Sequence, residues 1–165
     1  SIHAQYRQSK REIHKELRSN LLAVALESSK IYALIREKES YIIASSAEGF
    51  FESAPESMPT QAEPYPVQKI QAIVSLYFPA ILDHARELTF AWFHHEIAGT
   101  ELSEVLDQKN DGEASQKDVD EKVDNLRGEL QKVLEKQKQL EEAAQELMSK
   151  LLKEKSGNKT PKSHA

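Results

Sequence analysis

The most regular pattern in the chain lies at residues 115–154, which read SQKDVDEKVDNLRGELQKVLEKQKQLEEAAQELMSKLLKE. Apolar residues return here in alternating steps of three and four, which is the spacing of a coiled-coil helix. Ser115 and Asp118 stand at the spacing of a capping box, with Asp in place of the usual Glu, and predict the start of this helix. Gln137 and Ala144 thin the seam in its middle. Its apolar members, called the 119–151 seam below, are Val119, Val123, Leu126, Leu130, Val133, Leu140, Leu147 and Leu151.

Two further amphipathic segments precede this one. Residues 2–52 carry an apolar stripe at helical spacing, with no Gly or Pro before Gly49. Residues 53–66 contain four of the six prolines and predict an extended connector, because proline lacks the amide donor and disfavours helix in the preceding residue. Residues 67–107 resume the alternation of three and four, and Pro79 is expected to kink this second helix.

Together these segments predict an all-α fold, an elongated antiparallel bundle of three long helices with coiled-coil character. The helices are expected at residues 2–52, 67–107 and 115–154, within one domain over residues 1–155. Because a short polar loop joins the second helix to the third, these two should be antiparallel neighbours. Residues 156–165 are polar and predict a disordered tail.

The composition argues against several classes of partner and site. The formal net charge is −5, and this acidic excess disfavours a general attraction to nucleic-acid phosphates. The absence of cysteine excludes disulfides and thiolate chemistry. The chain has no apolar run of about 18 residues, so we expect it to reach a membrane only through a segment that this chain lacks. The prediction is a cytoplasmic location, with membrane association in a longer protein as the alternative.

The histidines of the second segment are the residues best suited to a metal site. His84 and His95 lie in its apolar seam, with Glu87 nearby. Their separation corresponds to about 16 Å along one helix, so they cannot share an ion within it. Neither a Glu three residues before a His nor a His-Glu-x-x-His pattern occurs. We favour partly buried polar residues over metal ligands, and the role of His84 and His95 stays open.

No pattern of catalytic residues stands out. The chain has no Gly-x-Ser-x-Gly motif and no glycine-rich phosphate loop. Paired carboxylates such as Glu141 and Glu142 fall on the solvent-facing side of the third segment, where charges usually serve solvation. We therefore predict a non-enzymatic protein without a cofactor.

Two clusters leave alternatives open. Tyr77, Phe78, Trp92 and Phe93 either fill the bundle core or line a groove for a partner helix. A basic cluster lies near the start of the chain at Arg7, Lys10, Arg11, Lys15 and Arg18. It suits an anionic membrane surface if a transmembrane helix precedes it, but interleaved Glu residues fit ordinary helix solvation equally well.

The short motif Leu76-Tyr77-Phe78-Pro79 follows a charged helix and a proline-rich break, and precedes a helix with alanines and aromatic residues. Over residues 1–100 the chain thereby resembles small bacterial proteins with one N-terminal membrane anchor and a helical part of unassigned function. The resemblance implies an anchored arrangement and assigns no site residues. Because the sequence starts at Ser1 without Met, we expect a cleaved tag or an excised fragment, including the removal of an N-terminal anchor.

These observations predict a non-enzymatic helical scaffold or protein–protein interaction module. The 119–151 seam is expected either to close an intramolecular bundle or to bind a partner, which would be another protein or a second copy. One alternative is a soluble membrane-proximal domain of a bacterial membrane-anchored protein. The other is a metal-binding helical bundle that uses His84 or His95 with carboxylates.

Overall fold

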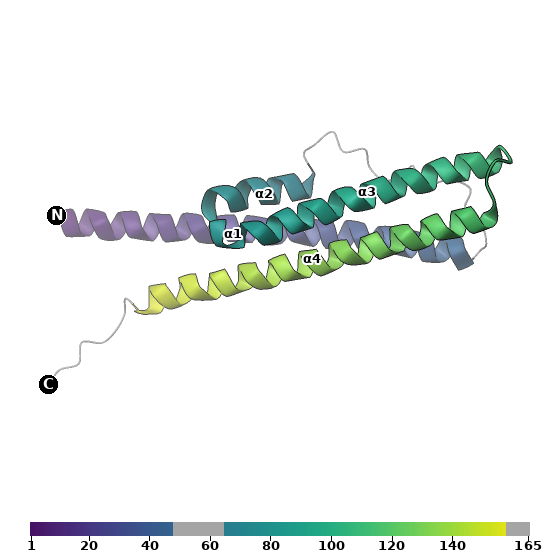
Figure 1. Ribbon diagram of the computed structural model, residues 1–165. Helices are drawn as coiled ribbons and strands as arrows, with labels where there is room; N and C mark the ends of the chain where they lie inside the picture. The colour runs from purple at the N-terminus through teal and green to yellow at the C-terminus, as the bar shows by residue number, and fades with distance from the viewer. Residues whose placement is uncertain (48–64, 158–165) are drawn as a thin grey trace.

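The computed structural model describes residues 1–47 and 65–157, which form four α-helices and one short 3₁₀ helix. The elements are α1 (Ile2–Ala47), α2 (Pro66–Tyr77), η1 (Pro79–Ile81), α3 (Leu82–Asn110) and α4 (Gln116–Gly157). They run alternately up and down an elongated bundle (Figure 1). The all-α prediction is confirmed, since no strand occurs in these two described stretches.

The second predicted helix is in fact two antiparallel helices joined by a tight turn (Figure 1). Pro79 has no amide hydrogen to continue α2. Phe78 leaves the helical region with φ −135° and ψ 59°, and its N–H donates to the Val74 carbonyl at 2.8 Å. The Ile81 N–H then donates to the Phe78 carbonyl at 3.0 Å. The prediction of three helices was therefore wrong in number, because Pro79 marks a reversal rather than a kink.

The first and last helices follow the sequence pattern closely. α1 extends over 46 residues without Gly or Pro, and its predicted end at residue 52 lies outside the described residues, as does most of the 53–66 connector. α4 starts at the predicted capping box, where the Ser115 N–H donates to Asp118 Oδ2 at 2.8 Å and the Asp118 N–H to Ser115 Oγ at 3.3 Å. The Ser115 backbone N–H and the Ser115 hydroxyl, which donates to the same oxygen at 2.7 Å, lower the pKa of the Asp118 carboxyl.

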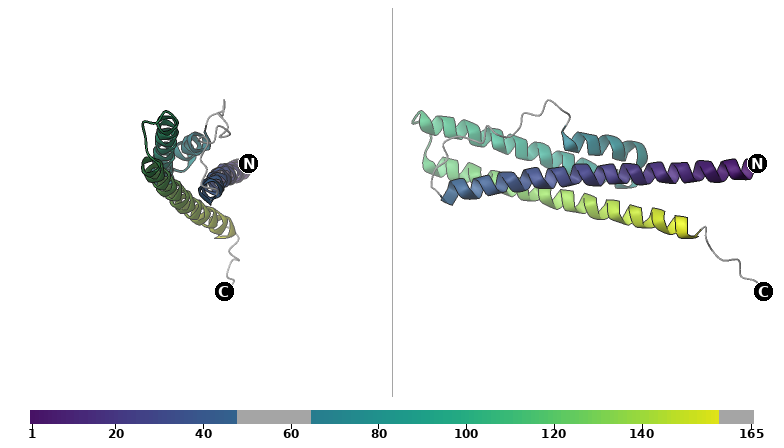
Figure 2. Two further views of the ribbon diagram at one scale, coloured as in Figure 1. Left: turned by 90° about the vertical axis from the view of Figure 1, so that its right-hand side faces the viewer. Right: turned by 180° about the vertical axis from the view of Figure 1, so that it is seen from behind.

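The core runs along the axis of the bundle. α4 packs against both α1 and α3, and the short α2 packs between α1 and α3 on the other side (Figure 2). Six members of the 119–151 seam are buried, and Leu147 and Leu151 near the end of α4 are half-buried. The chain thus covers most of this seam with its own helices. No helix formed by the described residues has both the length and the apolarity needed to cross a membrane.

Candidate functional site

α3 carries apolar side chains on two opposite faces. One face lies in the core and includes Leu88, Trp92 and Leu102. The other face holds Phe90, Phe93 and Ile97, whose side chains are 68%, 41% and 56% exposed. At 3.6 residues per turn these three residues fall within about 60° of the helix surface, turned away from the core. We call Phe90, Phe93 and Ile97 the outer stripe.

Two open hollows flank the outer stripe. One, of about 450 Å³, lies between α3 and α4, with Phe90 and His94 on one side and Lys132 on the other. The second, of about 360 Å³, lies along α3 and includes Phe93 and Ile97. The Phe90 ring packs on the His94 ring at 4.3 Å between centroids. Hollows beside an apolar ridge are the surface feature into which the side chains of a facing helix fit.

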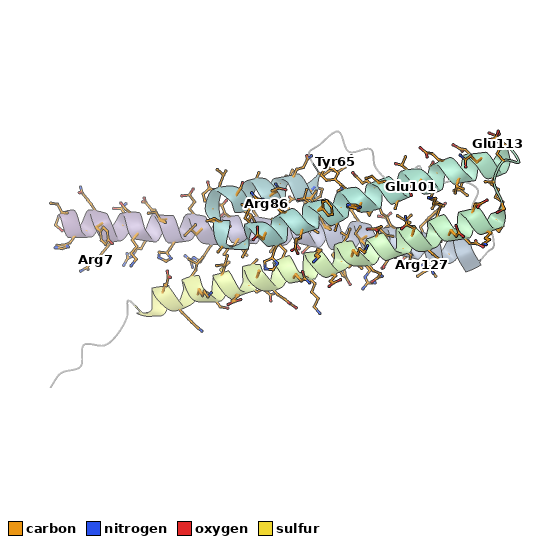
Figure 3. All side chains as sticks on the ribbon, in the orientation of Figure 1. Arg7, Tyr65, Arg86, Glu101, Glu113 and Arg127 are labelled. Atoms are coloured by element: carbon orange, nitrogen blue, oxygen red, sulfur yellow. The ribbon has the colours of Figure 1, made fainter. Side chains whose placement is uncertain are left out.

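The outer stripe has opposite charges at its two ends. Arg86 precedes the stripe and Glu101 follows it (Figure 3), and helical spacing places both on the same side of α3 as the stripe. Arg86 lies 3.7 Å from the Asp83 carboxylate, and Lys122 lies 3.2 Å from Glu101. Both pairs are solvent-exposed and hold these side chains only weakly. Arg86 and Glu101 are therefore available to a partner of complementary charge.

A partly buried polar cluster joins α1 to α3. Lys38 Nζ donates to His95 Nε2 at 2.7 Å, and His95 Nδ1 donates to the backbone carbonyl of Trp92. The ammonium also lies 5.3 Å from the centre of the Trp92 ring, a distance at which the ring face attracts a cation. Trp92 Nε1 in turn donates to Glu96 Oε1 at 3.1 Å. Each polar group of this cluster has a defined partner within it.

Burial sets the charge of this cluster. It lowers the pKa of Lys38 to about 8, against an opposing effect of the Glu96 carboxylate. Burial, followed by the neighbouring Lys38 charge, lowers the pKa of His95 to about 3. His95 is therefore neutral at pH 7, with one ring nitrogen donating and the other accepting. The cluster acts as a polar bridge between two helices.

The geometry around His84 and His95 gives little support to the metal-binding alternative. Both ring nitrogens of His95 already have partners, so it has no free lone pair for an ion. His84 is half-buried three turns earlier on α3. Within residues 1–47 and 65–157, no group of three or more His, Asp or Glu side chains is placed to hold a metal ion.

A second polar layer crosses the contact between α1 and α4. Gln137, the polar member of the seam, is buried, and its Nε2 donates to Ser28 Oγ at 2.8 Å and to Glu141 Oε2 at 2.9 Å. The buried Glu39 carboxylate accepts from Arg36 at 2.8 Å and from Gln131. Buried polar pairs of this kind fix the register of paired helices.

The aromatic cluster predicted from sequence is divided between the core and the surface. Phe78 and Trp92 are buried, whereas Tyr77 and Phe93 are exposed. Sequence reasoning missed the outer stripe, although the spacing of Phe90, Phe93 and Ile97 at three and four residues was visible in the sequence. The signal was hidden because the core face of the same helix also carries apolar residues throughout.

Comparison with known proteins supplies no relative for this surface. No protein-family model, curated protein or solved structure matches the chain. The resemblance of residues 1–100 to anchored bacterial proteins therefore stays a prediction, and function has to be argued from the chain's own surfaces.

Proposed function

We propose that this chain is a non-enzymatic helical scaffold that self-associates through α3. The outer stripe is the observation that carries the proposal, because three large apolar side chains lie together on a face that the bundle leaves open. Exposed apolar residues at helical spacing are typical of surfaces that bind another helix. The 119–151 seam was the first candidate for this role, but the chain's own helices bury most of it. The interaction surface is therefore assigned to α3.

A second copy is the partner that the charges favour. If two α3 helices pack antiparallel about a two-fold axis near Phe93, Phe90 of each copy faces Ile97 of the other. The same arrangement places Arg86 of each copy opposite Glu101 of the other. A two-fold interface is self-complementary, so each favourable contact occurs twice. The basic and acidic ends of the outer stripe meet this requirement.

The solution mass tests the proposal. Size exclusion with light scattering should give twice the chain mass of 18.7 kDa at high concentration and a fall toward the monomer on dilution. Replacing Phe90→Ser and Phe93→Ser should give a monomer of unchanged helicity. Leu22→Ser with Leu26→Ser is the matched control, since these α1 side chains are also exposed. A monomer at all concentrations, or equal dissociation of the control, would reject self-association through α3.

A charge exchange tests the antiparallel arrangement. Arg86→Glu places two carboxylates together in the dimer, and Glu101→Arg places two cations together, so each variant alone should dissociate more readily. A mixture of the two variants restores an opposite-charge pair at both contacts and should recover the wild-type dissociation constant. Analytical ultracentrifugation of the two variants, apart and mixed, measures this. If mixing restores nothing, the copies do not pair in this register.

A further inference from the structure

The first turns of α1 lie outside the packed part of the bundle. Residues 1–13 are all exposed, and this end of α1 extends beyond the turn that joins α2 to α3 (Figures 1 and 2). Ile2, Tyr6 and Ile13 are 84%, 66% and 57% exposed. None of α2, α3 and α4 covers these side chains, so this segment has an apolar surface that the fold does not use.

The charges of this segment are sorted around the helix. At 3.6 residues per turn, one arc of about 140° contains all five basic residues of residues 1–18, of which Arg18 is half-buried. These are Arg7, Lys10, Arg11, Lys15 and Arg18. Glu12 and Glu16 fall outside that arc, although they are interleaved with the basic residues in sequence. Ile2, Tyr6 and Ile13 occupy an adjacent arc of about 40°. Such a segment is a basic amphipathic helix.

The other end of the molecule has the opposite charge. Residues 1–18 hold five basic and two acidic side chains, whereas residues 101–124 hold nine carboxylates and three lysines. Arg7 and Glu113, labelled in Figure 3, lie at opposite ends of the bundle. An anionic surface therefore attracts the start of α1 and repels the loop between α3 and α4.

The basic arc is complementary in charge to two kinds of partner, lipid headgroups and the acidic end of a second copy. These partners differ in whether they can also bury the apolar arc. Among the described residues between Ile97 and Leu152, no large apolar side chain is exposed. The acidic end therefore has no large exposed apolar side chain on which Ile2, Tyr6 and Ile13 could pack. A lipid interface meets both needs, with phosphates for the basic arc and the acyl boundary for the apolar arc.

We propose that residues 2–18 of α1 bind peripherally to an anionic lipid surface. The long axis of the bundle is steeply inclined to the surface, and the protruding turns of α1 place the apolar arc at the acyl boundary and the basic arc at the headgroups. The acidic loop between α3 and α4 is turned away from the surface. This assignment uses no residue of the outer stripe, so it stands or falls separately from self-association.

Vesicle sedimentation tests the proposal on the whole chain. The protein should pellet with vesicles of phosphatidylcholine and phosphatidylglycerol in equal parts, and not with phosphatidylcholine alone. Replacing Arg7, Lys10 and Arg11 by Gln should weaken binding on the order of 100-fold. The control replaces three exposed lysines of α4 by Gln, an equal change in charge, at Lys117, Lys138 and Lys150. This control should bind as the wild type does.

A second variant tests the apolar arc. Ile2→Ser with Ile13→Ser leaves the charge unchanged and should weaken binding on the order of tenfold. Because these side chains lie outside the core, circular dichroism should show an unchanged melting temperature for every variant. Equal binding to both kinds of vesicle, no binding at low salt, or equal loss in the lysine control would overturn the proposal. Growth in mass at low salt without vesicle binding would identify the acidic end of a second copy as the partner instead.

Discussion

Lys38 and His95 show how burial sets the charge state of a polar contact inside a helical bundle. The two residues come from helices that are far apart in sequence and share one hydrogen bond of 2.7 Å beneath the Trp92 ring. A half-buried ammonium and a buried imidazole are compatible because the imidazole stays neutral and accepts. The sequence placed His95 in an apolar seam, but nothing in it paired that residue with Lys38, which reads as an ordinary surface lysine.

The pH dependence of stability should report on His95. Its pKa lies at about 3 in the folded chain, against an ordinary value of 6.5. Between these values the unfolded chain binds a proton that the folded chain does not. Stability should therefore fall as the pH drops from 6.5 toward 3, at up to about 1.4 kcal/mol per pH unit. Urea unfolding of the wild type and of His95→Leu, measured from pH 7 to pH 4, isolates this contribution as the difference in slope. If His95→Leu and the wild type lose stability in parallel, His95 does not remain unprotonated in the folded chain.

Among the elements, α4 is the helix on which the bundle depends. Leu130 and Leu140 are fully buried between α1 and α3. Leu130→Glu with Leu140→Glu would place two carboxylates without partners in this core. The chain should therefore lose several kcal/mol of stability. We expect circular dichroism to show loss of helicity from the whole chain, α1 and α3 included, since neither retains its main contact.

A milder substitution measures how much one buried leucine of α4 contributes to the free energy of unfolding. Leu130→Ala should lower the free energy of unfolding by about 2–5 kcal/mol, whereas the exposed Leu152→Ala should leave it nearly unchanged. Retention of folded α1, α2 and α3 in the double glutamate variant would show that α4 is an appendage rather than part of the core.

Periodicity alone was enough to predict α1 and α4 within the described residues, because their apolar stripes run without interruption. The turn at residues 78–81 could not be predicted in the same way. Pro79 allows either a kink or a reversal, and the local sequence is the same in both. The reversal lets Val67, Ile70 and Val74 pack against α1 and α3. That gain depends on tertiary contacts, which a pattern within one segment does not contain.

For the whole molecule, sequence left open which apolar stripes pair within the chain and which remain outside. The contact of Lys38 with His95 fixes how α1 and α3 lie alongside one another. The centre of the outer stripe, near Phe93, is then level with the last third of α1. A two-fold axis at that point leaves the first part of α1 protruding from each side of the dimer.

The length of the dimer should follow from this geometry. α1 has 46 residues and is about 69 Å long at 1.5 Å per residue. Antiparallel pairing of α3 should give a maximum dimension of about 100 Å, whereas contact between opposite ends of two copies would give about 140 Å. Small-angle X-ray scattering at a concentration where the dimer dominates separates these values. A dimension near that of a single α1 would indicate parallel pairing and contradict the proposed axis.

In this dimer the two basic ends of α1 point in opposite directions, which connects self-association with lipid binding. Each end reaches a different surface, so one dimer can link two anionic vesicles, while a monomer can bind only one. The wild type should therefore raise the turbidity of anionic vesicles. The variant with Phe90→Ser and Phe93→Ser should bind them without clustering. Replacing Arg7, Lys10 and Arg11 by Gln should abolish both effects. If the Phe90 and Phe93 variant clusters vesicles as strongly as the wild type, clustering reflects charge neutralisation on the lipid rather than a bridge built by α3.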